Sequence, residues 1–540
     1  LDLFVASQLD HLDNLTQVTG FDFRLLAPTE IVDANGNHAE MAYDTLGLPI
    51  ALATKGKCRN GICEADDLAA FRADYRLRNP DPLAVQAFCS APQMDEGAAR
   101  SWLASATRRF VYHFGDRQGL WTQQMPGSAA IVREQHRSSV SPLQVSLECS
   151  DGLGQVLMKK VQAEPDPDDA SANPPLRWIV NGLSVLNNKG KPVQQFEPAF
   201  VPDFGFEWPR ANGVSTITRY DGAGRVVRVD IPDGTYSRVD ISPWLIRQFD
   251  ANDTVLEAGN RWYADSTAAG AAPGLQRAAA LAARHANTPA ELHLDSLGRE
   301  VVAIAHNRTP DGAGNWQDAR YLTYTKLDAE GKPLWIVDAR GNKVMQYVLP
   351  AAATHTALFD AAADWRSAYD LLADAVPCYD IAGNLLYQRS MDAGDRWLLN
   401  DAAGKPMFAW DSNDQGPGSL SQERLLRTGY DRLQRPVALW LTIGQAPPAL
   451  VETFAYGDTQ GQAPAALATL QAANLIGQAV DHRDPGGRAT VERVDLSGQA
   501  AHVTRRLLRP HAGNAAGIID WSAGDSLLEA AAETFHQLTE

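Results

Sequence analysis

The chain has 540 residues, of which 45% are hydrophobic and 21% are charged. A chain of this kind can bury a large core or line a large wall, and no run approaches the ~18 to 20 apolar residues of a membrane span. The formal net charge of −17 argues against nucleic acid or an anionic membrane as a partner. We therefore expect neither nucleic-acid binding nor membrane insertion by this chain.

A short unit recurs from the first fifty residues onward. It reads Asp-x-x-Gly-(Asn/Arg/Lys), usually after an aromatic or apolar residue, and its clearest copy spans 220–225. A carboxylate that accepts backbone N–H groups, followed by a glycine at positive φ, makes a tight hairpin turn, and apolar alternation on each side supplies two strands. Neighbouring turns lie about 10 to 12 residues apart, which predicts short strands in a long antiparallel meander.

The residues that we expect to build these turns recur along most of the chain. They are Asp33, Gly36, Tyr43, Asp44, Gly47, Tyr220, Asp221, Gly224, Arg225, Asp233, Gly234, Asp295, Gly298, Asp338, Gly341, Tyr379, Asp380, Gly383, Asp401, Gly404, Tyr430 and Asp431.

Five cysteines in so long a chain do not form a disulfide scaffold. The close pair Cys58 and Cys63 allows either a local disulfide or half of a metal site. A zinc site needs about four N or S ligands, and neither a histidine nor a second cysteine pair stands nearby in the sequence. Free or locally bridged thiols are therefore the favoured interpretation, and the metal site is the weaker alternative.

Three passages interrupt the strand pattern with helical character. Residues 65–109 suit short amphipathic helices, residues 268–290 are rich in alanine and poor in β-branched residues, and residues 351–372 form a third candidate. We expect all three to be insertions that decorate one continuous architecture over residues 1–540.

A second kind of turn is predicted near residue 390. Ser390, Asp392, Gly394 and Trp397 have the spacing of an Asp-box, a hairpin turn in which the aspartate satisfies turn amides while the tryptophan packs beneath. One such copy is a folding device and does not indicate a sialidase.

The repeated turns resemble the YD repeat of the RHS family. Several non-repeat stretches are similar to the RHS portion of the B component of bacterial insecticidal toxin complexes, among them Cys149–Gln155, Arg177-Trp178 and Asn187–Val193. The resemblance covers nearly the whole chain. It implies a mainly β fold, in which a long antiparallel meander of hairpins curls into a spiral, hollow shell with short helical insertions.

The resemblance also implies a function, namely a non-enzymatic shell that encapsulates and protects a C-terminal toxic effector before delivery. We expect no catalytic residue, cofactor or metal in this chain. The implied partners are a C-terminal RHS half with its effector, an upstream toxin-complex segment and a pore-forming A component. The toxin would be secreted, and Leu1–Val5 show no signal peptide, so we expect a fragment of a longer protein.

Two other functions stay open on the sequence alone. A carbohydrate- or cell-surface-binding protein could be built from the same repeats, and it would expose a cluster of Trp and Tyr beside carboxylates and amides. A glycosidase on a β scaffold would need two carboxylates about 5 to 10 Å apart, one of them with a raised pKa.

Overall fold

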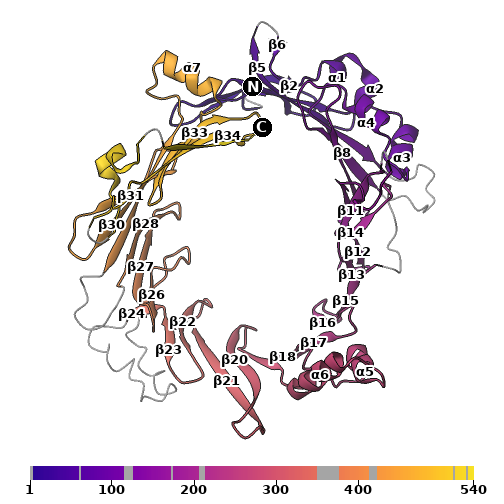
Figure 1. The fold of residues 1–540 in the computed structure, drawn as a ribbon, viewed down its shortest axis with the longest axis vertical. Coiled ribbons are helices and arrows are strands. Elements are labelled where there is room, and N and C mark those ends of the chain that lie inside the picture. Colours follow the sequence, from indigo (N-terminus) through magenta and orange to yellow (C-terminus); the bar gives the residue numbers. More distant parts are fainter. Residues whose placement is uncertain are drawn as a thin grey trace.

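The structure is a computed structural model that describes residues 4–59, 62–114, 126–151, 153–171, 174–205, 213–349, 376–412, 423–514, 517–530 and 533–539. Its strands follow one another round a ring with an open centre, and the two ends of the chain meet on the same side of that ring (Figure 1). The mainly β, antiparallel, curled architecture that the sequence predicts is confirmed.

The first sheet forms the N-terminal part of the ring. Its strands are, in spatial order, β1 (Ser7–Leu9), β2 (Leu15–Asp22), β3 (Ala27–Val32), β4 (Asn37–Tyr43), β5 (Pro49–Arg59), β7 (Arg108–His113), β8 (Gly127–Arg133), β9 (Leu143–Ser150), β10 (Val156–Ala163), β11 (Arg177–Asn181) and β14 (Ala199–Val201), with β6 (Ile62–Cys63) paired to β5.

The second sheet continues the ring to the C-terminal end. Its strands are β12 (Ser184–Leu186), β13 (Pro192–Phe196), β15 (Ser215–Tyr220), β16 (Val226–Asp230), β17 (Tyr236–Ile241), β18 (Leu245–Phe249), β19 (Ala290–Leu294), β20 (Glu300–Pro310), β21 (Trp316–Leu327), β22 (Pro333–Val337), β23 (Lys343–Gln346), β26 (Tyr387–Ser390), β27 (Gly394–Asn400), β28 (Pro406–Asp411), β29 (Arg424–Tyr430), β30 (Pro436–Ile443), β31 (Ala449–Tyr456), β32 (Ala479–Asp484), β33 (Gly487–Val494), β34 (Ala500–Leu507) and β35 (Thr534–Leu538).

The two sheets interlock where they meet. The chain passes from β11 into β12 and β13 of the second sheet, returns to pair β14 with β11, and then enters β15, which pairs with β13. A separate pair, β24 (Val348–Leu349) with β25 (Val376–Pro377), lies off the main path. Because each main-path strand hydrogen-bonds to its neighbours in the order, the wall is continuous within each sheet.

Helices lie on the outer side of the ring (Figure 1). The predicted range 65–109 contains α1 (Ala69–Ala73), α2 (Tyr75–Arg78), α3 (Pro82–Ser90) and α4 (Glu96–Leu103). The side chains of Asp81 and Asp95 cap α3 and α4 by accepting N–H bonds from Leu83 and Ala98.

A second helical group lies in and before the range 268–290. It comprises α5 (Arg261–Thr267), which starts ahead of the predicted boundary, α6 (Pro273–Ala282) and η1 (Ala283–His285). The helix α7 (Pro464–Ala472) and the 3-10 segment η4 (Trp521–Leu527) were not anticipated. The predicted helical passage 351–372 lies outside the described residues.

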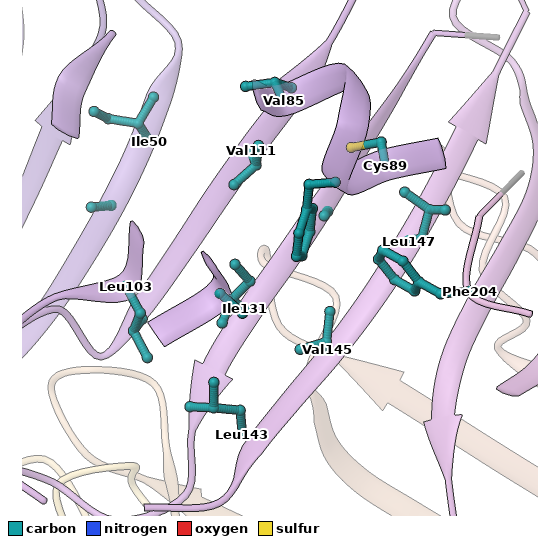
Figure 2. Packing of buried hydrophobic residues seen from close by; sticks show 14 of the residues in the cluster. Ile50, Val85, Cys89, Leu103, Val111, Ile131, Leu143, Val145, Leu147 and Phe204 are labelled. Atoms are coloured by element: carbon teal, nitrogen blue, oxygen red, sulfur yellow. The ribbon is translucent and has the colours of Figure 1, made fainter. Parts of the chain in front are cut away.

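The largest apolar cluster lies between the first helical group and the first sheet. Leu143, Val145 and Leu147 alternate along β9 with less buried residues, as a strand with one covered face requires. Figure 2 shows them with Ile131 and Phe204 beneath the helices. Full burial of such side chains stabilises the fold by about 1.5 to 3 kcal/mol each, so the helical cover provides the best-buried core of the described wall.

Candidate functional site: repeat turns and a closing seam

The turn at Asp221 shows the geometry of the repeat. The N–H of Asp221 donates to the carbonyl of Arg225 at 2.9 Å, and the N–H of Gly224 donates back to the carbonyl of Asp221 at 3.0 Å. Asp221 Oδ1 accepts the N–H groups of Ala223 and Arg225 at 3.0 and 2.9 Å. Gly224 has φ = +81°, a conformation that favours glycine. Backbone and carboxylate together close the turn.

The same pattern recurs at most of the other predicted turns. The carboxylate at the first position accepts the N–H of the fifth residue, and the fourth residue has positive φ. These turns begin at Asp33, Asp44, Asp295, Asp338, Asp380, Asp401 and Asp431. The fourth residues are Gly36, Gly47, Gly298, Gly341, Gly383 and Gly404, with Gln434 in the last turn at φ = +61°.

One turn departs from the Asp-x-x-Gly pattern. At Gly234, which has φ = +90°, the first position is Ile231 and not Asp233, because the N–H of Gly234 donates to the carbonyl of Ile231. In the repeat, the aspartate lies three positions before the glycine. Asp233 lies directly before Gly234 and therefore cannot be the first residue of this turn. Its carboxylate instead accepts the N–H and the hydroxyl of Thr235 at 2.8 and 2.7 Å.

The Asp-box-like turn also works differently from the prediction. Ser390 Oγ, rather than the carboxylate of Asp392, accepts the amides of Asp392 and Ala393, each at 3.3 Å. Ser390 pairs with Gly394, which has φ = +74°, across a three-residue connection. Trp397 packs beside Tyr387, with ring centroids 4.5 Å apart.

A tyrosine ties each of several turns to an earlier one. Tyr220 Oη donates to the carbonyl of Pro192 at 2.7 Å, and Lys191 Nζ lies 5.5 Å from the centre of the same ring. We call the hydrogen bond from the tyrosine hydroxyl to the proline carbonyl the tyrosine tie. It recurs from Tyr43 to Pro28 at 3.1 Å, from Tyr379 to Pro333 at 2.6 Å, from Tyr430 to Pro406 at 2.7 Å and from Tyr456 to Pro436 at 3.0 Å.

The ring is closed by contacts between residues far apart in the chain. Asn35 Nδ2 donates to the carbonyl of Ile476 at 3.1 Å, and the N–H of Ile476 donates to Asn35 Oδ1 at 2.9 Å, although 441 residues separate the two. Asn14 likewise donates to Asp458 at 2.9 Å and accepts from the N–H of Thr459 at 3.0 Å.

Further hydrogen bonds extend this contact. Asn37 donates to Asn474 at 3.0 Å, and Gln471 donates to the carbonyl of Ala34 at 3.0 Å. We call the contacts of 13–14, 34–37 and 57 with 458–460, 471, 474 and 476 the closing seam. The residues Asp33, Asn35 and Asn37, whose spacing imitates a calcium loop, are used here for a turn and for the seam.

The electrostatics of the turns suit a structural role. Backbone and side-chain hydrogen bonds from Arg225 lower the pKa of Asp221, and the side chain of Arg299 is the main cause of the lowered pKa of Asp295. Every carboxyl group of the described residues whose pKa is displaced has it lowered. These groups are held as carboxylates by the N–H and O–H groups that donate to them and by neighbouring cations.

The structure decides the question that the cysteines left open. Cys58 and Cys63 form a disulfide, while Cys89, Cys149 and Cys378 are buried free thiols. Among the described residues, no group of three or more His, Cys, Asp or Glu side chains is placed to hold a metal ion. No helix in the described ranges is both long and apolar enough to cross a membrane.

The sequence missed some features of this site. Asp311 opens a turn of the same kind, with Gly314 at φ = +85°. Residues 311–315 fit the Asp-x-x-Gly-Asn pattern, yet they are not among the turn residues predicted above. This turn is therefore predictable from the sequence. The tyrosine ties and the closing seam had no local signal, because each joins residues that no short motif connects.

The chain is similar in sequence or in structure to several known proteins. No family model matches the chain. Toxin subunit YenC2 of Yersinia entomophaga is 24% identical over 245 residues, which are 44% of this chain and 22% of YenC2. A crystal structure of TcdB2-TccC3 matches this chain at 20% identity with a TM-score of 0.67. The match covers 99% of this chain and 23% of the TcdB2-TccC3 chain.

A structure of the Photorhabdus luminescens Tc holotoxin pore matches equally well. The match covers 99% of this chain and 25% of the holotoxin chain, at 17% identity and a TM-score of 0.68. This chain spans about a quarter of the length of these proteins. The repeat turns, the curled antiparallel wall and the matched structures agree with the resemblance in the sequence, and the chain therefore has the RHS-repeat shell fold of bacterial Tc toxin components.

Proposed function

We propose that this chain is a non-enzymatic wall segment, of the B-component type, in a secreted toxin complex, and that it encapsulates and protects a C-terminal toxic effector before delivery. The observation that carries the proposal is the closing seam. Asn35 and Ile476 are 441 residues apart in the chain, yet they exchange two hydrogen bonds across the ring closure. A wall that closes on itself round an open centre can separate a cargo from proteases (Figure 1).

One strand edge supports the proposal of a C-terminal partner. Within the described residues, β35 pairs with β34 alone, so its outer edge offers unpaired N–H and C=O groups to a further strand. We propose that a C-terminal RHS half continues the wall there and carries the effector. An upstream toxin-complex segment and a pore-forming A component complete the proposed assembly.

The two alternative functions receive less support. Among the described residues, the exposed tryptophans Trp244 and Trp397 do not form one cluster, because Trp244 precedes β18 and Trp397 lies on β27, on another part of the ring (Figure 1). A glycosidase needs a general acid with a raised pKa. The displaced carboxyl pKa values described above all move the other way.

The proposal is tested by protection of a cargo. The chain is co-expressed with a C-terminal RHS half that carries an effector, the complex is digested with a protease, and the effector is followed by mass spectrometry. We expect the effector to survive in the complex and to be cut when expressed alone. Electron cryo-microscopy of the same complex should show density within the ring. Digestion at equal rates, or a wall without a lumen, would contradict encapsulation.

A further inference from the structure

A cavity of about 390 Å³ lies between the first helical group and the first sheet. It is lined by the turn before β5, by α2 and α3 with the segment that joins them, and by β7. Figure 2 shows Val85 of α3 and Val111 of β7, which line it together with Ile50 of β5. The volume falls within the range of small-molecule sites, about 300 to 1,000 Å³.

A buried cation lines this cavity. Arg109 on β7 is only 1% exposed, and its guanidinium lies 5.3 Å from the ring centre of Phe71. One of its nitrogens donates to the carbonyl of Ile50 at 3.3 Å, while its Nε has no acceptor in the described part of the chain. A buried guanidinium without an ion pair loses much of its hydration free energy, so an anion beside it would be strongly stabilised.

A second guanidinium lines the same cavity. Arg78, the last residue of α2, also has a buried Nε without an acceptor among the described residues. Asp44 is the single carboxylate among the described lining residues; its charge acts on Arg109, but no ion pair joins the two, and its Oδ1 accepts the N–H of Leu48 within its own turn. Two cations against one carboxylate leave the lining with an excess of positive charge, in a chain whose net charge is −17.

The exposed part of the lining is mostly apolar, with Thr45 as a polar exception. Leu46 is 70% exposed, and Leu83 and Phe114 are each 66% exposed. The buried arginine and these exposed apolar side chains therefore give the cavity two unlike ends. Such a site suits a molecule with an anionic head and an apolar body, whose head enters first.

We propose that this cavity binds a small organic carboxylate with an apolar body, such as a medium-chain fatty acid. The carboxylate oxygens accept hydrogen bonds from Arg109 and Arg78, since a guanidinium presents N–H donors in the geometry that a carboxylate matches. The apolar body lies against Ile50, Val85 and Val111, with its end near the exposed leucines.

Calorimetric titration of the 540-residue chain with octanoate tests the proposal. We expect saturable binding at one site per chain, and at least tenfold weaker binding of octanol, which has the apolar body without the charge. Arg109→Met should weaken octanoate at least tenfold, because it removes the cation and fills a similar volume. Leu83→Asp should also weaken it severalfold through repulsion at the opening.

The matched control is Leu153→Asp, which places the same charge on a leucine that is 85% exposed and does not line the cavity. It should bind octanoate as the parent does. The proposal is overturned if octanoate does not saturate, if octanol binds equally well, or if Leu83→Asp binds like its control. Should Arg109→Met fail to fold, octanol and Leu83→Asp alone decide.

Discussion

The hydroxyl of Tyr430 donates to the carbonyl of Pro406 at 2.7 Å across two neighbouring repeat turns. Lys405, the residue before that proline, places Nζ 5.7 Å from the centre of the same tyrosine ring. A single side chain is thus held by a hydrogen bond and by a cation–π contact, both from the preceding turn. The tyrosine of the YD unit therefore serves to fix the spacing of successive hairpins.

Replacing Tyr430 by phenylalanine removes the hydrogen bond and keeps the ring. A neutral hydrogen bond contributes about 0.5 to 1.5 kcal/mol, so amide exchange in β28 and β29 should accelerate roughly two- to tenfold. Hydrogen exchange followed by mass spectrometry measures this. Tyr321→Phe is the control, because Tyr321 is 48% exposed and its hydroxyl has no partner among the described residues. Equal acceleration by both variants would contradict the role of the tie.

Two glycines with the same conformation should differ in their tolerance of alanine. Gly404 has φ = +80° and open space where a Cβ would lie, so Gly404→Ala should cost about 1 kcal/mol for the strained backbone. At Gly234, with φ = +90°, the added Cβ would lie 2.9 Å from Arg261 Cβ and 3.0 Å from the Trp262 nitrogen. Gly234→Ala should therefore be clearly the more destabilising, as measured by local hydrogen exchange. If Gly404→Ala were the more destabilising variant, the start of α5 would have to move away from the added Cβ at position 234.

The closing seam should depend on Asn35. Its substitution by alanine leaves the N–H and the carbonyl of Ile476 without their partner, and each unpaired buried group costs about 1 to 3 kcal/mol. We expect faster proteolysis and exchange at 457–478. Leu297→Ala is the control, because Leu297 has the same position in its turn and is 70% exposed. Unchanged protection at 457–478 would mean that the other seam contacts suffice.

The turn carboxylates should make the hairpins sensitive to acid. Asp295 has a lowered pKa chiefly because the side chain of Arg299 donates to it. A group whose folded pKa lies below its unfolded value of about 3.9 contributes its full stability above that pH, and the contribution is lost as the pH falls through the folded pKa. Exchange in β19 and β20, corrected for intrinsic rates, should therefore rise below about pH 4.

Asp295→Asn is the matched variant for this acid sensitivity. An amide can still accept the turn N–H groups, as Asn187 does in its own turn at 2.9 and 3.1 Å, but it does not ionise. The variant should lose the pH dependence at β19 and β20. A variant with an unchanged acid response would show that other carboxylates control these strands.

The cysteines predict a simple thiol count. Burial raises the pKa of the Cys89 and Cys149 thiols to about 12, so neither should react quickly with iodoacetamide in the folded chain at pH 8. After unfolding, three thiols should react without a reductant and five with one, since Cys58 and Cys63 are joined. Five reactive thiols without a reductant would contradict the disulfide.

Local chemistry explains why the sequence predicts so much of this fold. The turn at Asp221 needs only residues 221 to 225, so its carboxylate and its positive-φ glycine are visible in a five-residue window. Asp233 and Asp392 show the limit of that window. In both cases the motif marks a turn. At Asp233 a neighbouring residue takes the first position of the turn, and at Asp392 a neighbouring residue is the acceptor, and the register of the strands decides which residue it is.

Non-local contacts explain the rest. The pairing of Asn35 with Ile476 depends on the curvature accumulated over many strands, and no pattern in the sequence specifies that curvature. The sequence around Arg109 does not distinguish it from the other arginines, because its burial depends on α3 covering it. Family resemblance, and not spacing, is what connected the repeats to a shell.

The sequential order of strands in the second sheet has a mechanical consequence. In the part of the chain that the structure describes, each strand from β15 to β34 is hydrogen-bonded only to the two strands next to it in the order, and β35 is the last strand of that order. A load applied at β35 would therefore rupture one rung at a time, starting from that end, instead of shearing the whole sheet at once. The wall would then open strand by strand from its C-terminal end.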